Sequence, residues 1–197
     1  MILSTLAAPA RHELIVRKSR FVARATAIDS AEPAAAFLGS VHSADASHHC
    51  WAYRIGGVYR ASDDGEPAGT AGRPILAAID GQHCDHVMVV VARWFGGIKL
   101  GAGGLVRAYG GAASECLRNG LRTPLIDLAQ FVIACGFEHV GAVHQLIERH
   151  GASKRTETFT ADGLHFAIEL PRERVAALQN ALRDATRGQA CIMEATE

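Results

Sequence analysis

The sequence predicts a two-domain protein with α-helices and β-strands in both domains. Three observations support this prediction. The 197 residues are enough for two domains, 49% of them are hydrophobic, and the hydrophobic pattern becomes more regular after Thr123-Pro124. We therefore expect an N-terminal domain over residues 1–124, a linker at Thr123-Pro124 and a C-terminal domain over residues 125–197.

The N-terminal half alternates between strand and helix periodicities. The alternation in Arg20–Ile28 and His49–Ile55 indicates half-buried strands, whereas the continuous apolar run Val87–Ala92 indicates a buried central strand. Gly56-Gly57 is typical of a hairpin turn. The predicted elements in chain order are strands at Arg11–Val16 and Arg20–Ile28, a helix from Ser30 to Ser43, strands at His49–Ile55 and Val58–Ala61, a polar loop at Ser62–Gly69, a helix from Thr70 or Gly72, a strand at Val87–Ala92 and a glycine-rich helix at Ala102–Asn119.

The C-terminal half has a regular order of strand, helix, strand, strand, helix and strand. Proline at the first position favours a helix start at Pro171, and Ala161-Asp162-Gly163 is a turn between two strands. The predicted elements are Asp127–Cys135, Glu138–His150, Ala152–Thr160, Leu164–Leu170, Pro171–Arg187 and Ala190–Glu194. This β-α-β-β-α-β order is typical of a ferredoxin-like fold.

Composition narrows the functional classes. Lys+Arg and Asp+Glu both number 20, but residues 1–125 hold 13 basic and 10 acidic residues, which slightly favours an anionic partner for this half. Solvated surface charge explains the same numbers. The five cysteines form no CxxC pair, so we expect no disulfide framework and a reducing, cytoplasmic location. The first residues make a poor signal peptide, and no apolar run is long enough to span a membrane.

The most informative segment runs from Gly96 to Gly110, between the buried strand and the glycine-rich helix. The free N–H groups of a helix start favour anions, and Gly101, Gly103 and Gly104 would allow a ligand to approach the backbone. The segment is not a Walker loop, because Ala102 stands where lysine would be needed. It is not the dinucleotide fingerprint, which would need glycine in place of Val106. A tight strand–helix connection with close packing is the alternative.

Nearby cationic residues would add charge to this anion site. Lys99 and Arg107 lie in the segment itself, and Arg93 lies at the end of the preceding strand. Aromatic and basic residues are also mixed further upstream, a combination that suits single-stranded nucleic acid. That mixture consists of Trp51, Tyr53, Arg54, Tyr59, Arg60, Trp94 and Phe95. Burial in the core explains Trp51 and Tyr53 as well, and would leave Arg54 on the solvent side.

A second group of candidate residues is acidic. Asp63, Asp64 and Glu66 place three carboxylates within four residues, which suits a divalent cation or acid–base chemistry. Asp-Asp-Gly is also an ordinary turn sequence, and the acids could instead pair with Arg73 or Arg107.

His48-His49-Cys50 precedes these acids. On a strand, His48 and Cys50 share a face that His49 does not, and two ligands do not make a zinc site, so we predict no metal. A Cys50 nucleophile has no visible activating group.

Taken together, several motifs in order give the chain a resemblance to the Impact (YigZ-type) family. These motifs are Ser19-Arg20-Phe21, Asp45-Ala46-Ser47-His48, Cys50-Trp51-Ala52-Tyr53-Arg54, Ser62-Asp63-Asp64-Gly65-Glu66-Pro67, Gly69-Thr70-Ala71-Gly72-Arg73-Pro74, Phe95-Gly96-Gly97-Ile98-Lys99-Leu100-Gly101 and Gly103-Gly104-Leu105-Val106-Arg107-Ala108-Tyr109. They cover the first domain nearly end to end. His49 and Trp94 depart from the family pattern, which usually has asparagine and tyrosine there.

The resemblance implies a fold and a general role. The first domain is expected to share the α/β fold of ribosomal-protein and elongation-factor domains, and the two domains together to resemble domains IV and V of elongation factor G. Eukaryotic relatives act in translational control by binding a regulatory protein, and bacterial members are usually linked to nucleic acid or the ribosome. The resemblance brings no catalytic residues and no cofactor.

We therefore expect a non-enzymatic, translation-associated protein that contacts RNA or the ribosome. The residues expected to make the contact are Arg54, Arg73, Arg93, Lys99 and Arg107, with the backbone of Gly101, Gly103 and Gly104. One alternative is a small-ligand or phosphate-binding protein or hydrolase, with a site between the Asp63–Glu66 loop and the Gly96–Gly104 connection. His48, Asp63, Asp64 and Glu66 would form this second site. A pure protein-interaction module is the other alternative.

Overall fold

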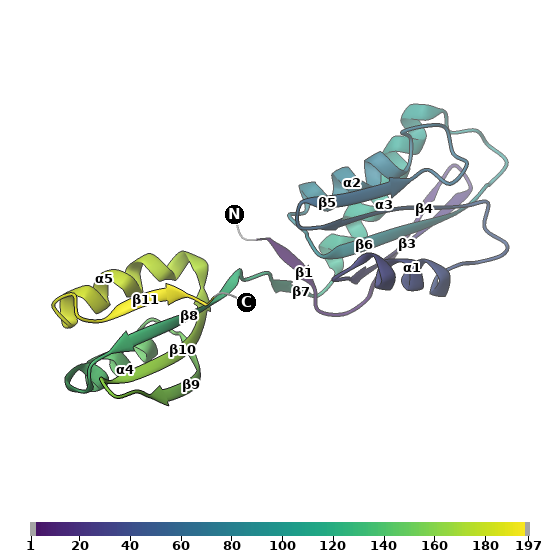
Figure 1. Ribbon diagram of the computed structural model, residues 1–197. Helices are drawn as coiled ribbons and strands as arrows, with labels where there is room; N and C mark the ends of the chain where they lie inside the picture. The colour runs from purple at the N-terminus through teal and green to yellow at the C-terminus, as the bar shows by residue number, and fades with distance from the viewer. Residues whose placement is uncertain (1–2, 196–197) are drawn as a thin grey trace. The chain divides into compact units, whose positions relative to one another are not determined.

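The computed structural model describes residues 3–195 and divides the chain into two compact units, residues 1–125 and 126–197 (Figure 1). Each unit has its own sheet and its own hydrophobic core. The chain therefore combines two α+β units, as the sequence predicts.

A five-stranded antiparallel sheet is the centre of the N-terminal unit, with strand order β2-β3-β6-β4-β5. Its strands are β2 (Ala10–Val16), β3 (Ser19–Ala27), β4 (His48–Ile55), β5 (Val58–Ser62) and β6 (Val87–Trp94). The apolar run of β6 takes the middle position and is buried on both faces up to Arg93. The prediction of a central strand here is confirmed, because a side chain on either face of β6 meets a helix layer rather than water.

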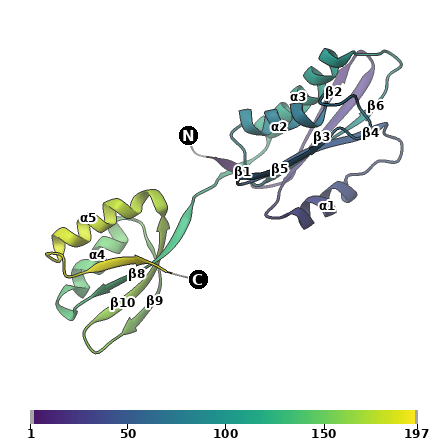
Figure 2. The ribbon, with the colours of Figure 1, turned by 45° about the horizontal axis from the view of Figure 1, so that its top comes forward.

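Helices cover both faces of this sheet, as Figure 2 shows. The helices are α1 (Ala31–Ser40), α2 (Gly72–Gly81) and α3 (Ala102–Asn119). The larger core lies under α2 and α3, where Tyr109 packs edge-on against Phe21. The smaller core lies under α1 and includes Tyr53 and Met88. The predicted core positions of Trp51 and Tyr53 are therefore confirmed, since both pack on the α1 side.

Two short strands were not predicted. β1 (Ser4–Leu6) pairs antiparallel with β7 (Arg122–Pro124), so Thr123-Pro124 is a strand segment and the prediction of a linker there is wrong. Pro124 lies at the end of this small sheet, where its missing N–H costs no ladder hydrogen bond. Strands of three residues carry too little periodicity to be recognised in the sequence.

The C-terminal unit has the predicted element order. Its strands are β8 (Leu128–Cys135), β9 (Ser153–Phe159), β10 (Leu164–Pro171) and β11 (Cys191–Glu194), and its helices are α4 (Val140–Arg149) and α5 (Val175–Ala185). A 3-10 turn precedes each helix, at Phe137–His139 and at Arg172–Arg174. The four strands are antiparallel, in the order β11-β8-β10-β9, and alternate residues of β8 and β10 enter the core with Leu178 and Leu182 of α5. Among residues 3–195, no helix is both long and apolar enough to cross a membrane.

Candidate anion-binding surface

The sheet topology brings the predicted site segments, apart from Arg54, to one end of the N-terminal unit. Arg54 pairs with Val87 at the other end of β6. Arg20 near the start of β3 pairs with Trp94 at the end of β6, and His48 at the start of β4 pairs with Arg93. The connection from β6 to α3 and the connection from β5 to α2 both leave the sheet at this end. The acidic loop and the glycine-rich segment, which are far apart in sequence, therefore adjoin in space.

Asp63 has a structural role at the start of α2. Its carboxylate accepts hydrogen bonds from the backbone N–H groups of Gly69 (2.8 Å), Ala71 (3.0 Å) and Gly72 (2.8 Å). Burial acts to raise the pKa of Asp63, but these three donors outweigh it and hold the pKa below its ordinary value. Asp63 thus supplies the cap that Ala71, at the N-cap position, cannot supply.

Asp64 and His48 tie the same loop to β4. The Asp64 carboxylate accepts a hydrogen bond from the backbone N–H of His49 at 2.5 Å, and Nδ1 of His48 lies 2.7 Å from the carbonyl oxygen of Asp64. Asp64 has a φ of 41°, in the left-handed region that aspartate tolerates in turns. These contacts favour the turn interpretation of Asp63 and Asp64, because both carboxylates are engaged by backbone donors.

Glu66 is the centre of a buried polar network. Its Oε1 lies 2.5 Å from Nη1 of Arg93 and accepts a hydrogen bond from the Tyr109 hydroxyl at 2.8 Å. The two charged side chains are only 4% and 7% exposed. The Nε2 of His48 lies 3.9 Å from the same carboxylate oxygen. The acid therefore pairs with Arg93, which joins the loop, β6 and α3, rather than with Arg73 or Arg107.

Cys50 lies beside this network and is shielded from solvent. Its thiol donates to the carbonyl oxygen of Asp63 at 2.9 Å, and burial raises its pKa to about 12. Such a thiol is protonated at neutral pH and is not a nucleophile. Across residues 3–195, no three His, Cys, Asp or Glu side chains are grouped closely enough to hold a metal ion.

The glycines of the β6–α3 connection serve different purposes. A Cβ on Gly96 would lie 2.0 Å from the carbonyl carbon of Lys18, so glycine is required for the approach of that backbone. The Gly96 N–H donates to Oγ of Ser19 at 3.1 Å. Gly101 occupies the N-cap of α3 with a φ of 73°, and its carbonyl oxygen accepts from the N–H of Leu105.

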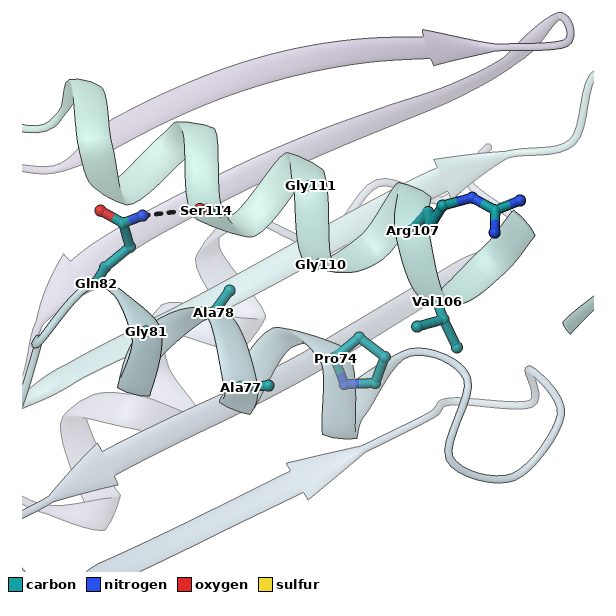
Figure 3. Close-up of a pocket in the computed structure, with 10 residues that line it drawn as sticks. All are labelled: Pro74, Ala77, Ala78, Gly81, Gln82, Val106, Arg107, Gly110, Gly111 and Ser114. Atoms are coloured by element: carbon teal, nitrogen blue, oxygen red, sulfur yellow. Dashed lines mark hydrogen bonds between the residues drawn. The ribbon is translucent and has the colours of Figure 1, made fainter. Parts of the chain in front are cut away.

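Packing does not explain every glycine in α3. A Cβ on Gly104 would come within 2.9 Å of Cβ of Leu100, but on Gly103, Gly110 or Gly111 it would meet nothing closer than 3.5 Å. The close-packing interpretation therefore holds for Gly104 and fails for the other three. Small residues line a groove on the outer side of α2 and α3, which has a volume of about 530 Å³. Arg107 and Val106 flank this groove, as Figure 3 shows.

Three of the predicted basic residues are exposed near this end. Arg73 in the first turn of α2, Lys99 in the connection and Arg107 in α3 have no carboxylate within 4.0 Å in the part of the chain that the structure describes. Arg107 lines the groove, and Arg73 directly precedes Pro74, which lines it from α2. Gly103, in the first turn of α3, is exposed, and a Cβ there would lie 3.6 Å from Nη1 of Arg107.

The other two predicted basic residues are engaged inside the unit. Arg93 is the buried partner of Glu66. Arg54 was expected on the solvent side of the sheet. It lies instead on the α2 side, where its Nε is 2.7 Å from the Asp80 carboxylate. Each cation is neutralised by an acid from a distant part of the sequence, which the sequence alone does not reveal.

Two basic residues escaped sequence reasoning. Arg17 and Lys18 form the two-residue turn between β2 and β3, with φ values of 44° and 69°. Arg17 and Arg107 line a common hollow of about 170 Å³, together with Leu100 and Gly104. The available signal was a pair of cations between two strand patterns, but a turn without glycine or asparagine is hard to recognise.

Comparisons with known proteins agree on one family. Residues 17–117 match the model of the Impact N-terminal domain, and residues 133–189 match a domain of unknown function, DUF1949. The chain is 47% identical to "IMPACT family member in pol 5'region" of Thermus thermophilus, over 89% of this chain and 97% of that protein. It is 34% identical to "IMPACT family member YigZ" of Escherichia coli K12, over 92% of each. A crystal structure of a hypothetical protein covers 100% of the chain with a TM-score of 0.65 and 33% identity.

Proposed function

The chain belongs to the Impact family, and on that basis we propose that it is a non-enzymatic, translation-associated protein whose N-terminal domain binds RNA. In this proposal the chain consists of an N-terminal domain over residues 1–124 and a C-terminal domain over residues 125–197. The strand order of the C-terminal unit supports a ferredoxin-like assignment for that domain. The proposal also includes the likeness of the two domains to domains IV and V of elongation factor G. The five free cysteines favour a cytoplasmic location.

The observation that carries this proposal is a group of exposed cations with no acidic partner. Around the start of α3, the side chains of five residues have no carboxylate within 4.0 Å among residues 3–195. These residues are Arg17, Lys18, Arg73, Lys99 and Arg107. Unpaired cations at one end of a domain suit a polyanion, because each can release a counterion from a phosphate. We name this group the basic end.

The backbone adds to the basic end. The first-turn amides of α3 have no acceptor within the helix, and the partial positive charge of a helix N-terminus favours a phosphate there. Gly103 in this turn is exposed, whereas Leu100 packs against Gly104. Arginine and lysine side chains would then position the strand, and the helix start would hold one phosphate.

The alternative of a small-ligand enzyme receives less support. Its proposed acids are already committed, since Asp63 caps α2, Asp64 holds His49 and Glu66 pairs with Arg93. An acid–base catalyst needs a carboxylate that can reach its substrate, whereas the Glu66 side chain is 4% exposed. A protein partner for the basic end remains a distinct outcome of the test below.

Fluorescence anisotropy with labelled single-stranded RNA tests the proposal. We expect binding that weakens as salt rises, and a smaller salt slope for Lys99→Ala and Arg107→Ala, by roughly 0.7 for each phosphate that the variant no longer neutralises. The matched control is Arg183→Ala, which removes an exposed arginine from the C-terminal unit. If the parent shows no binding at low salt, the RNA proposal is wrong. A pull-down that survives nuclease treatment would then identify the basic end as a protein-binding surface.

A further inference from the structure

A second hollow in the N-terminal unit has the features of a site for a nucleotide. It lies between the edge strand β5 and helix α2, has a volume of about 610 Å³ and is separate from the groove in Figure 3. Its lining includes one exposed aromatic ring, Tyr59, with Arg54, Arg73 and one carboxylate on the α2 side, whereas the side chains of Trp51 and Arg60 belong to the α1 side of the sheet. The residues that line it are Trp51, Arg54, Tyr59, Arg60, Ala61, Arg73, Leu76 and Asp80.

Local geometry explains how the two walls form. Residues 73, 76 and 80 are three and four positions apart on α2, so they occupy one face of the helix. Tyr59 and Ala61 are two apart on β5 and point to the same side of the strand. Tyr59 pairs with Arg54 in the ladder, and Arg54 reaches Asp80 of α2, which places the Tyr59 ring on the helix side of the sheet.

The charges in the hollow are not balanced. Arg54 is held by Asp80 at 2.7 Å, and its guanidinium lies over the Tyr59 ring at 5.4 Å from the centroid. Arg73 has no carboxylate within 4.0 Å in the described part of the chain. Arg60 pairs with Tyr53 in the ladder, so its side chain leaves β5 on the α1 side. One arginine thus remains for an anion after the single acid in the hollow has been neutralised.

The aromatic wall is available to a ligand. Tyr59 is 57% exposed, although its ring belongs to an ordered strand and is already stacked with a guanidinium. Leu76 and Ala61 add apolar surface next to it. A flat exposed ring, an apolar floor and an uncompensated arginine match a base and its phosphate better than a simple anion, which would need no ring.

We propose that this hollow binds one phosphorylated nucleoside, with the base stacked on Tyr59 and the phosphate held by Arg73. Two ligands supply such a phosphorylated nucleoside: a single-stranded RNA that continues from the basic end, or a free mononucleotide. The first source rests on the proposed function, and the second does not. Because Arg73 belongs to both the hollow and the basic end, one strand can reach both surfaces.

The test titrates the full chain with a labelled adenosine decamer RNA by anisotropy and with adenosine monophosphate by calorimetry. Tyr59→Ala should weaken binding between about 5-fold and about 150-fold, the range for loss of one base–aromatic stack, whereas Tyr59→Phe should bind like the parent. Arg73→Ala should also weaken binding, and Arg183→Ala should not. Thermal unfolding of each variant shows whether it is folded.

The outcomes separate the two proposals. Loss of RNA and mononucleotide binding in Tyr59→Ala supports the nucleotide site. Mononucleotide binding by a parent that does not bind RNA supports the site with a free nucleotide as its ligand and contradicts the proposed function. If Tyr59→Ala binds RNA like the parent while Arg107→Ala does not, the hollow is not a nucleotide site and the proposed function stands. If the parent binds neither ligand, both proposals are wrong.

Discussion

The hydroxyl of Tyr109 donates a 2.8 Å hydrogen bond to Glu66, and this contact fastens the glycine-rich helix to the acidic loop. Arg93 completes the arrangement from the central strand. The network lies directly beneath the exposed end of the N-terminal unit, so its integrity sets the positions of the segments that form the basic end. Both tryptophans of the chain, Trp51 and Trp94, lie in this unit, so their fluorescence reports its unfolding alone.

Loss of the Glu66 charge should strongly destabilise the N-terminal unit. Glu66→Gln leaves the Arg93 guanidinium buried without a counter-charge, which typically lowers the free energy of unfolding by about 3–5 kcal/mol. Denaturant unfolding followed by tryptophan fluorescence measures this loss. Glu115→Gln, which removes an exposed partner of Arg118, should cost less than about 1 kcal/mol. Equal effects of the two changes would contradict the role of the buried pair.

Asp63 should make the stability of the N-terminal unit sensitive to acid. Despite burial, its three backbone donors hold its pKa below the ordinary value of 3.8, so its contribution is complete above that value and is lost as the pH falls through the folded pKa. Asp63→Ala should lower the free energy of unfolding by about 1–2 kcal/mol near neutral pH, as loss of a helix cap does. The difference between parent and variant should shrink below about pH 4. A difference that stays constant into acid would show that the carboxylate charge is unimportant.

Gly96 should tolerate no side chain. In Gly96→Ala the new Cβ would meet the Lys18 backbone at 2.0 Å, so the turn between β2 and β3 must move, at a cost of about 2–3 kcal/mol. Gly97→Ala is the matched control, since a Cβ there has open space and only the φ of 82° opposes it, at about 1–2 kcal/mol. Denaturant unfolding compares the two variants. A smaller loss for Gly96→Ala than for Gly97→Ala would contradict the close approach.

Gly111 should be replaceable with a gain in stability. A Cβ at this position would come no closer than 3.9 Å to its nearest neighbour, a methyl carbon of Leu14, and alanine favours the helix by about 1 kcal/mol over glycine. Gly111→Ala should therefore raise the denaturant midpoint of the N-terminal unit. A lower midpoint would show that the added methyl group clashes with its neighbours, contrary to this spacing.

One thiol should react in the native protein. Burial raises the pKa of Cys50 and Cys116 to about 12, and Cys84 and Cys135 are also buried. Cys191 is exposed on β11. A water-soluble aromatic disulfide should therefore label one cysteine rapidly at pH 8, and Cys191→Ser should abolish that phase. Rapid labelling of a second thiol would show that Cys50 or another buried cysteine is accessible.

The sequence predicts the long elements of this fold well. The glycine-rich helix at Ala102–Asn119 has the bounds expected for it, and Leu105 and Tyr109 face the core as their spacing indicates. The strand β6 was recognisable because its apolar run is too long for a surface loop and too short for a helix. Local periodicity carries this information, so no knowledge of distant contacts is needed.

Charge pairing was less predictable than the elements. Arg93 and Glu66 are 27 residues apart, and Arg54 and Asp80 are 26 apart, so nothing local shows that either arginine is neutralised. Arg17 was missed for a related reason, since its place beside Arg107 depends on how two distant segments pack. The sequence pattern predicts which segments contribute to the candidate site, whereas tertiary contacts decide which of its cations remain exposed.

The contact between Gly96 and the Lys18 backbone has a consequence for the energetics of recognition. The two cations at the tip of the β2–β3 hairpin stand on a backbone that is held by its neighbour and by the hydrogen bond to Ser19. Their main chain is therefore already ordered before any ligand arrives. A ligand that contacts Arg17 or Lys18 has to restrict only side-chain rotamers, so preorganisation of the turn leaves more of the interaction free energy for affinity.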